Sequence, residues 1–298
     1  MTLRHLEIFV AVCDRMNMTA AAGDLFLSQS AVSQAVAELE SHYGVRLFER
    51  LSRRLYLTEA GGRLLSYGRH ILRMSQDAEG ELRALSQGGT VRVGASVTIG
   101  TCVLPRLAAD FLREYPQCRV EVVEDNTAGV EALLLGDRLD LGLVEGSLTS
   151  GDLVGRPFTE DRLVLLCGPE HPLAGRDRVE PGELEGRDFI LREVGSGTRR
   201  TFETGMARLG LSWREVWTCS NTDTIKAAVM LGLGLSVLSL RAVEAELEAG
   251  TLHQLEAEGL SFLRRFQVVH HQHKFLTPAM SGFMACCFSQ GEREARPE

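Results

Sequence analysis

The sequence predicts a multidomain chain of mixed α+β and α/β class, with a small helical N-terminal domain, one long helix and two α/β lobes. The length of 298 residues exceeds what one hydrophobic core usually serves. Apolar residues recur at helical spacing in the first part of the chain. After Gly88-Gly89, short strand-like runs alternate with helical patterns, which is typical of α/β units.

Composition narrows the class of protein. A hydrophobic content of 44% and a charged content of 24% are those of an ordinary globular chain. The seven cysteines are odd in number and contain no C-x-x-C pair, which favours reduced thiols in the cytoplasm. No apolar run reaches the roughly 18 to 20 residues that span a bilayer, and the N-terminus lacks an export signal. We therefore expect a cytoplasmic protein without a membrane partner.

The net charge of −8 hides a locally basic stretch. Between Arg46 and Arg54 four arginines stand against one acid, Glu49. A solvated loop is the ordinary interpretation of such a run taken alone. Phosphate binding depends on where charge is placed, however, so the neighbouring motifs decide the matter.

The N-terminal domain, residues 1–58, shows three helical patterns and a hairpin. We expect Thr19 to cap the second helix and Ser28 to cap the third. The predicted elements are helices over residues 3–13, 19–25 and 28–41 and a β-hairpin over 47–57. The helices together make a helix-turn-helix, and its second helix, over residues 28–41, would lie in the major groove.

The third helix has two faces of different character. Val32, Val36 and Leu39 form its apolar face, and Ala31 and Ala35 are small enough for close helix packing. Amides pair with adenine and hydroxyls serve either base type, so we predict base readers on the polar face. These are Gln29, Ser30, Ser33 and Gln34. Beside the hairpin, Arg50, Arg53 and Arg54 would hold phosphates and supply affinity rather than sequence choice.

A long helix is predicted from Thr58, its cap, to about Gln87, with Glu59 at the positive end of the helix dipole. Apolar residues recur along it in two series with a seven-residue period, and Glu81 breaks the second series. They are Leu57, Leu64, Ile71, Ala78 and Leu85, with Ala60, Tyr67 and Met74 three residues further on. A helix packed on its own domain would show a face of similar width. We prefer self-association, which makes residues 59–89 a linker and dimerisation helix.

The C-terminal part alternates strands and helices. Strands are predicted over residues 91–95, 120–123, 139–144, 163–167, 189–192, 215–219, 235–238 and 264–270. Helices are predicted over 104–114, 128–135, 198–209, 222–231 and 277–289. We assign 90–160 with 265–290 to lobe 1 and 161–264 to lobe 2, with crossovers near 159–162 and 261–264. The polar tail, 291–298, is expected to be disordered.

Five stretches of the N-terminal part resemble the LysR-type regulator family. They are Leu6–Phe9, Leu27–Gln34, Leu39-Glu40, Gly44–Arg50 and Leu57–Gly61. Their order and spacing are more specific than a lone helix-turn-helix. The resemblance implies a winged helix-turn-helix over residues 1–58, a dimerising linker helix and an effector domain like a periplasmic solute-binding protein. It also implies a dimer or tetramer and double-stranded DNA sites with dyad symmetry. RNA polymerase would be a further partner. Ala37 and Ser30 depart from the residues common in the family, which leaves the recognised DNA sequence open.

Two segments have the composition of anion-binding helix starts: 96–101 and 195–199. Each places hydroxyls, glycine and free backbone N–H groups at the positive end of a helix. In a two-lobed fold both would face one cleft, together with a third helix start at Thr222. The predicted effector-binding residues are Ser96, Thr98, Thr101, Ser196, Gly197, Thr198, Arg199 and Thr222. Plain capping explains each segment taken singly.

Residues 191–199 are similar to LysR-type regulators of sulfur assimilation and autotrophic carbon fixation. This implies an inorganic oxyanion or a phosphorylated or carboxylate metabolite as effector. Glu145 would oppose a purely anionic ligand unless it bonds a hydroxyl or stays outside the site. An uncharged ligand, or oxidation of cysteines such as Cys286-Cys287, remains an alternative trigger.

Nothing in the chain favours catalysis. Neither Lys226 nor Lys274 stands in a phosphate-binding loop, and no paired nucleophile and base emerges. His270, His271 and His273 have no evident partner ligand and fit a polar cluster at a strand end. An enzyme or a solute binder fused to a DNA-binding domain is the competing class. We therefore expect a regulator without a metal or a cofactor.

Overall fold

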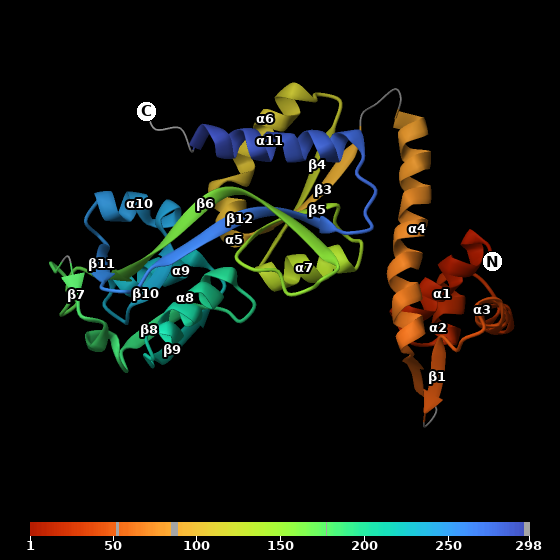
Figure 1. Cartoon of the computed structure of the whole chain (residues 1–298), viewed down its shortest axis with the longest axis horizontal. Coiled ribbons are helices and arrows are strands. Elements are labelled where there is room, and N and C mark those ends of the chain that lie inside the picture. The colour runs from red at the N-terminus through yellow and green to blue at the C-terminus, as the bar shows by residue number, and fades with distance from the viewer. Residues whose placement is uncertain (52–53, 85–88, 177, 295–298) are drawn as a thin grey trace. The chain divides into compact units, whose positions relative to one another are not determined.

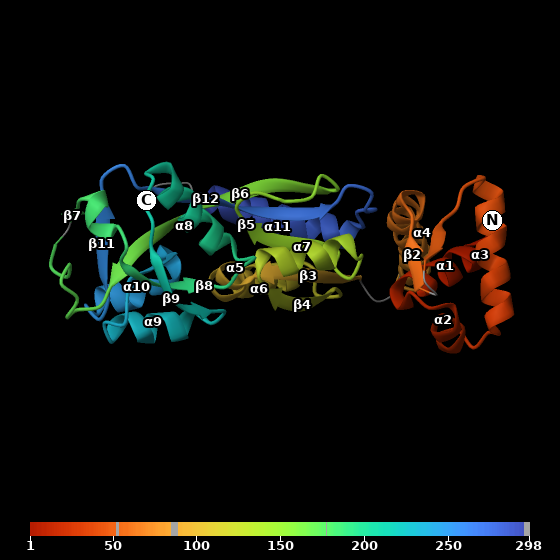
Figure 2. The same ribbon diagram turned by 90° about the horizontal axis from the view of Figure 1, so that it is seen from below.

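The structure is a computed structural model that describes residues 1–51, 54–84, 89–176 and 178–294. It divides into two compact units (Figures 1 and 2). Unit 1 is formed mainly by residues 1–89, and unit 2 mainly by the residues from Thr90 onward.

Unit 1 contains the predicted helices and hairpin. Its elements are α1 (Leu3–Arg15), α2 (Met18–Asp24), α3 (Gln29–Tyr43), β1 (Phe48–Leu51), β2 (Arg54–Leu57) and α4 (Glu59–Ala84). Ser28 and Thr58 cap α3 and α4 as predicted, each accepting a hydrogen bond from the backbone N–H three residues later. The predicted cap of α2 was wrong. Asn17, which has an extended backbone, accepts from the N–H of Thr19 at 2.9 Å, so Thr19 is already inside the helix.

The core of unit 1 lies among α1, α2, α3 and the hairpin. Val32, Val36 and Leu39 are buried in it, as predicted for the apolar face of α3. Ala35 is also buried, whereas Ala31 is exposed and does not serve close packing. The opposite face of α3 is therefore left to solvent.

Glu40 fixes the hairpin against α3. Its carboxylate accepts hydrogen bonds from the backbone N–H groups of Leu47 at 2.8 Å and Phe48 at 3.2 Å. The hydroxyl of Thr58 donates to the carbonyl oxygen of Arg46 at 2.8 Å. Because one carboxylate satisfies two backbone donors at the start of the hairpin, the position of the hairpin relative to α3 is defined.

The predicted apolar seam along α4 divides into two parts. Leu57 lies on β2 rather than on the helix, and with Ala60 and Leu64 it packs against the core of unit 1. That part follows the alternative of a helix packed on its own domain. Leu85 and the predicted end of the helix near residue 87 fall outside the described residues. Four members of the seam are exposed: Tyr67, Ile71, Met74 and Ala78. Self-association through α4 stays a prediction.

Unit 2 is built from alternating strands and helices (Figure 1). Its first part contains β3 (Thr90–Ser96), α5 (Val97–Cys102), α6 (Leu104–Glu114), β4 (Arg119–Asp125), α7 (Thr127–Leu135), β5 (Leu141–Glu145) and β6 (Leu153–Cys167). The middle contains β7 (Arg178–Val179), the 3₁₀ turn Pro181–Leu184, β8 (Asp188–Arg192), α8 (Gly197–Arg208), β9 (Arg214–Cys219), α9 (Thr222–Met230) and β10 (Ser236–Ser239). The last part contains α10 (Leu240–Glu248), β11 (His253–Ala257), β12 (Phe262–His271) and α11 (Pro278–Glu294).

Two long antiparallel strands, β6 and β12, connect the lobes of unit 2. In lobe 1, β4, β3 and β5 are parallel and β12 is antiparallel to β5. β12 pairs with β6 from His271↔Leu153 to Phe262↔Leu163, and beyond that point β6 pairs with β10 and β11 of lobe 2. The stretch 159–162, predicted as a crossover, lies within this β6–β12 pair, and the second predicted stretch, 261–264, lies at the start of β12. The parallel pair β8–β9 forms a separate sheet.

Each lobe has its own apolar core. Phe111, Phe266 and Phe283 belong to one, and Phe189 and Phe202 to the other. The predicted division into residues 1–58, 59–89, 90–160 with 265–290, and 161–264 stays a prediction. The sequence did not indicate α10, β7, β11 or the first half of β6, and it indicated α5 only through the helix start at 96–101.

The predicted disordered tail was wrong at its start. α11 continues to Glu294, so residues 291–294 are helical. Gly291 is buried, and a Cβ atom there would lie 1.6 Å from the carbonyl oxygen of Phe158 on β6. This tertiary contact holds the end of the helix, and composition alone does not reveal it.

Candidate functional site

The first candidate site is the polar face of α3. Gln29, Ser30 and Gln34 are exposed and Ser33 is half-buried, so the predicted readers share the face opposite the core. Such a face is what a recognition helix presents to base edges.

Two of these residues already have partners within the protein. The hydroxyls of Ser30 and Ser28 are 2.9 Å apart, and the amide of Gln34 donates to the carboxylate of Glu38 at 2.9 Å. Gln34 keeps its carbonyl oxygen and a second N–H for a base. Gln29 makes no side-chain hydrogen bond with any described residue, so its whole amide is open to a base.

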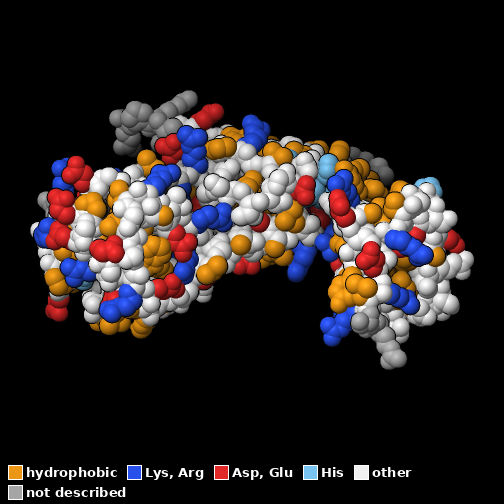
Figure 3. All heavy atoms as spheres, turned by 60° about the horizontal axis from the view of Figure 1, so that its bottom comes forward, with side chains coloured by type: hydrophobic (Ala, Val, Ile, Leu, Met, Phe, Trp, Pro, Cys, Tyr) orange, Lys and Arg blue, Asp and Glu red, His pale blue; other side chains and the backbone are white. Residues whose placement is uncertain are grey.

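The predicted phosphate contacts lie on the hairpin. Arg50 on β1 and Arg54 on β2 are exposed, and neither forms an ion pair within the described ranges. Arg53 lies outside the described residues. On the face shown in Figure 3, basic side chains are mixed with acidic and apolar ones rather than gathered into one broad basic surface.

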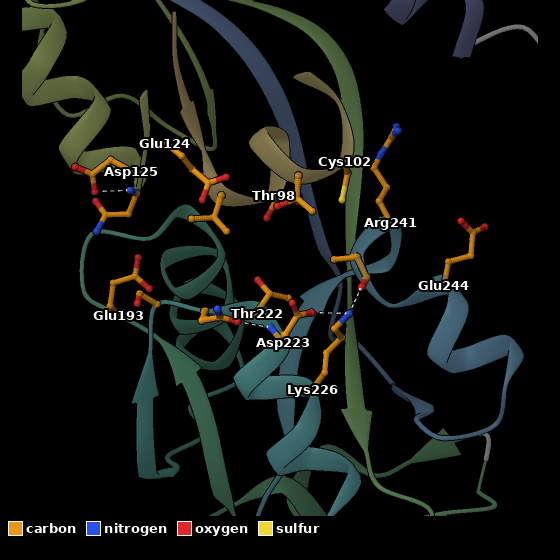
Figure 4. Close-up of a pocket in the computed structure, with 16 residues that line it drawn as sticks. Thr98, Cys102, Glu124, Asp125, Glu193, Thr222, Asp223, Lys226, Arg241 and Glu244 are labelled. Carbon is orange, nitrogen blue, oxygen red and sulfur yellow. Dashed lines mark hydrogen bonds and ion pairs between the residues drawn. The ribbon is translucent and has the colours of Figure 1, made fainter. Parts of the chain in front are cut away.

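The second candidate site is a cavity of about 840 Å³ between the lobes of unit 2. Thr98 on α5 and Glu124 at the end of β4 face Glu193, Thr222 and Asp223 across it (Figure 4). Of the predicted effector residues, Thr98, Thr101 and Thr222 line this cavity.

A buried arginine links the other predicted residues. Arg264 on β12 has a side chain that is 1% exposed and forms ion pairs with Glu145 at 3.2 Å and Asp161 at 2.7 Å. It also donates to the hydroxyls of Thr198 on α8 at 2.9 Å and Thr98 on α5 at 3.3 Å. One guanidinium thus bridges the two lobes. Sequence reasoning missed Arg264 and Asp161, because no motif marks either residue.

Both alternatives that the sequence left open apply to Glu145, which bonds a hydroxyl and does not line the cavity. It accepts a hydrogen bond from the hydroxyl of Ser96, so that hydroxyl already donates within the protein. Ser196 is buried, and its hydroxyl has no partner among the described residues. A Cβ atom on Gly197 would lie 2.5 Å from Cγ of Glu145, so only glycine allows this approach.

The position of Arg199 argues against its predicted role. Its guanidinium donates to Glu203 at 2.7 Å, to Glu215 at 2.6 Å and to the carbonyl oxygen of Arg192 at 3.1 Å. The hydrogen bond to Glu215 raises the pKa of Arg199 further. Arg199 does not line the cavity, and it joins α8 to β9 instead.

The cavity is acidic. Its described lining contains the carboxylates Glu124, Asp125, Glu193, Asp223 and Glu244 and the cations Lys226 and Arg241. The ammonium of Lys226 is already paired with Asp223 at 3.0 Å and Glu246 at 2.8 Å. Arg241 lies 3.8 Å from Asp161. Neither cation is therefore fully available to a ligand.

The cysteines are poor candidates for a redox trigger. All seven are unpaired. Burial raises the pKa of the Cys102 thiol, which lines the cavity, and raises that of Cys167 to about 11. The thiol pKa values of Cys286 and Cys287 are also raised by burial. Oxidation proceeds through the thiolate, which these environments disfavour.

The described residues contain no helix long and apolar enough to cross a membrane. They also contain no group of three His, Cys, Asp or Glu side chains placed to hold a metal ion. β12 ends at His271, so His273 is not on the strand face where sequence reasoning placed it.

Two family models match the chain. The model of bacterial regulatory helix-turn-helix proteins of the lysR family matches residues 3–62. The model of the LysR substrate binding domain matches residues 85–291. The two matches cover the polar face of α3 and the cavity of unit 2.

Known relatives match along nearly the whole length. The HTH-type transcriptional regulator YeiE of Escherichia coli K12 is 37% identical over 286 residues, covering 96% of this chain and 97% of YeiE. The RuBisCO operon transcriptional regulator of Allochromatium vinosum is 34% identical over 295 residues, covering 98% and 97%. Among solved structures, the regulatory domain of CcmR from Synechocystis PCC6803 in complex with 2-PG has a TM-score of 0.64. Its sequence is 27% identical, and the match covers 68% of this chain and 98% of that domain.

Proposed function

The chain belongs to the LysR family of bacterial transcriptional regulators, and we propose that it binds double-stranded DNA through α3 and the hairpin under the control of a small molecule held between the lobes of unit 2. The observation that carries the proposal is the cavity of about 840 Å³ with walls from both lobes. Its volume falls within the range of about 300–1,000 Å³ that small-molecule sites occupy. Dyad-symmetric DNA sites, a dimer or tetramer, a cytoplasmic location and contact with RNA polymerase belong to the same proposal.

We propose an anionic metabolite as the first candidate effector, either an inorganic oxyanion or a phosphorylated or carboxylate compound. The similarity to a regulatory domain solved with 2-PG supports it. Within this chain, an anionic group would have to reach the start of α8, where the buried hydroxyl of Ser196 lacks a partner among the described residues. The N-terminal end of α8 favours negative charge there.

An uncharged ligand rich in hydroxyl groups is the second candidate. The specific observation in its favour is the described lining of the cavity, where five carboxylates face two cations that already have acidic neighbours. Hydroxyl groups can donate to those carboxylates, whereas an anion would be repelled by them.

Thermal unfolding of the full chain separates these candidates. The panel contains sulfate, phosphate, sugar phosphates, small carboxylates and uncharged sugars. A ligand at about 100 times its dissociation constant adds roughly 2.7 kcal/mol, which corresponds to a Tm shift of about 5–10 °C for a domain of this size. Thr222→Val should reduce the shift, whereas Thr224→Val should leave it, because only Thr222 lines the cavity. A stabilising ligand that responds equally to both variants would contradict binding in the cavity.

The DNA-binding part is tested with an operator selected from random oligonucleotides. Gln29→Ala should weaken specific binding by about 1–3 kcal/mol and leave random DNA unaffected, because base contacts carry the sequence choice. Arg54→Ala should weaken both and reduce the slope of log K against log salt by about 1. Equal losses on both DNAs for Gln29→Ala would remove this residue from the base readers.

A further inference from the structure

Unit 2 contains a second, smaller hollow of about 350 Å³. It lies along α8, between this helix, the outer face of β12 and the turn after β5. The described residues that line it are Gly146, Ser147, Pro157, Gly197, Arg200, Thr201, Thr204, Gly205, Arg208, Ser261, Leu263, Arg264, Arg265 and Gln267. We call it the arginine groove. It shares no lining residue with the larger cavity.

One face of α8 forms a wall of this groove. Residues 197, 200, 201, 204, 205 and 208 follow each other at spacings of three and one, which places them on a single helical face. Small residues occupy the middle of this face. A Cβ atom on Gly205 would lie 2.4 Å from the ring of Phe262, so glycine lets α8 approach β12. These small side chains form a shallow surface between Arg200 and Arg208, which are two turns apart, about 12 Å along the helix.

The charge of the arginine groove is opposite to that of the larger cavity. Four arginines and no Asp or Glu are found among its described lining residues. Glu145 and Asp161 neutralise the buried Arg264, and Arg265 lies 3.5 Å from the exposed Glu160. Two arginines, Arg200 and Arg208, have no such acidic partner in the described part of the chain.

The donors that these two arginines offer are still available. Arg200 uses one N–H, which donates to the carbonyl oxygen of Ser147 at 2.6 Å. Arg208 is exposed and makes no hydrogen bond or ion pair with any described residue. The hydroxyls of Thr201 and Thr204 donate back into the helix, each at 2.8 Å, so they do not compete as donors. The guanidinium groups of Arg200 and Arg208 are therefore the donors open to a ligand, and the planar arrangement of their N–H groups matches the oxygens of a phosphate group.

We propose that the arginine groove is an anion-binding site of the protein, and that its ligand is inorganic phosphate or a metabolite carrying a phosphate group. The phosphate bridges the guanidinium groups of Arg200 and Arg208 over the floor of small residues. Arg200 also ties α8 of lobe 2 to the turn after β5 of lobe 1, so a bound phosphate acts on a contact between the lobes. This site is separate from the effector cavity and does not require it.

The test is isothermal titration calorimetry of the full chain with inorganic phosphate, at low ionic strength because salt screens exposed charges. The variants are Arg208→Glu, which alters an exposed residue without disturbing the fold, and Arg200→Gln. The matched control is Arg113→Gln on α6, an exposed arginine outside the groove that pairs with Asp110. Arg54→Gln measures any phosphate held by the DNA-binding surface.

Saturable binding that weakens at least tenfold in Arg208→Glu and in Arg200→Gln, but less than twofold in Arg113→Gln and Arg54→Gln, is the expected result. Binding that all the arginine variants preserve, or no saturable binding up to about 10 mM phosphate (a free energy of about −3 kcal/mol), overturns the proposal. Binding lost in Thr222→Val but kept in Arg208→Glu would place the phosphate in the effector cavity. That outcome overturns the arginine groove and leaves the proposed function intact. If the Tm shift caused by an effector is not reduced in Thr222→Val, effector binding in the larger cavity is contradicted and the arginine groove is unaffected.

Discussion

Replacing Arg264 by glutamine should strongly destabilise unit 2. Its guanidinium is the counter-charge of Glu145 and Asp161, and all three side chains are 1% exposed. The substitution leaves Glu145 without a cation and Asp161 with only Arg241, 3.8 Å away, and it removes the donor to two threonine hydroxyls. Breaking a buried ion pair on one side costs about 3–5 kcal/mol.

The adjacent residue provides the control. Arg265 is the same residue type on the same strand, but its side chain is 65% exposed and its partner Glu160 is 75% exposed. Solvent screens this pair, so Arg265→Gln should cost about 0–1 kcal/mol. The expected difference between the two variants is therefore several kcal/mol.

Thermal unfolding of the full chain measures the difference in stability between Arg264→Gln and Arg265→Gln, taken from the transition assigned to unit 2. For a unit of this size, 3–5 kcal/mol corresponds to a Tm decrease of about 6–20 °C. Adding Glu145→Gln to Arg264→Gln should recover part of the loss, because one unpaired charge is removed, and the double-mutant cycle measures the coupling. If Arg264→Gln and Arg265→Gln lower the Tm equally, the argument that Arg264 holds the lobes together is wrong.

Three other predictions follow from single positions. Gly291→Ala should destabilise the chain by about 1–3 kcal/mol, since its Cβ atom would lie 1.6 Å from a carbonyl oxygen of β6. Gly62→Ala should instead stabilise α4 by about 0.5–1 kcal/mol, because nothing lies within 4 Å of a Cβ atom there. Paired melting curves of the two variants check both predictions. Ile71→Glu should weaken self-association in sedimentation experiments and Gln76→Glu should not, because Ile71 belongs to the exposed apolar seam of α4; an unchanged oligomer would exclude this seam as the interface. Burial raises the pKa of Cys13 from 9.0 to about 12, so the thiol stays protonated to a higher pH in the folded state than in the unfolded state. The resulting stability is complete below pH 9 and declines as pH rises toward 12, and denaturation at several pH values should show a shallower alkaline decline in Cys13→Ala.

Local signals in the sequence determined the elements of unit 1 and most of unit 2. Ser28 was identified as a cap because its type and its position before an apolar period suffice, and the structure has it in that role. α6 begins and ends at Leu104 and Glu114, as predicted, because Tyr115-Pro116 prevents its continuation. The polar face of α3 followed from helical periodicity alone.

The sequence also determined the family, because the five matching stretches lie close together in one domain. It placed the predicted hydroxyl groups near the meeting point of the lobes. It did not show what those hydroxyls contact, since a serine at a helix start has the same local pattern whether it binds a ligand or an internal carboxylate.

Only the tertiary structure decided the electrostatics of unit 2. Arg264 reaches Thr198 and Thr98 across 66 and 166 positions of sequence, and no local pattern encodes such separations. The folding of β6 beside β12 also buries Asp161, so that a charged residue on a connecting strand becomes part of the polar centre. The acidic cavity and the basic groove arise in the same way, because distant segments bring together charges that are scattered along the chain.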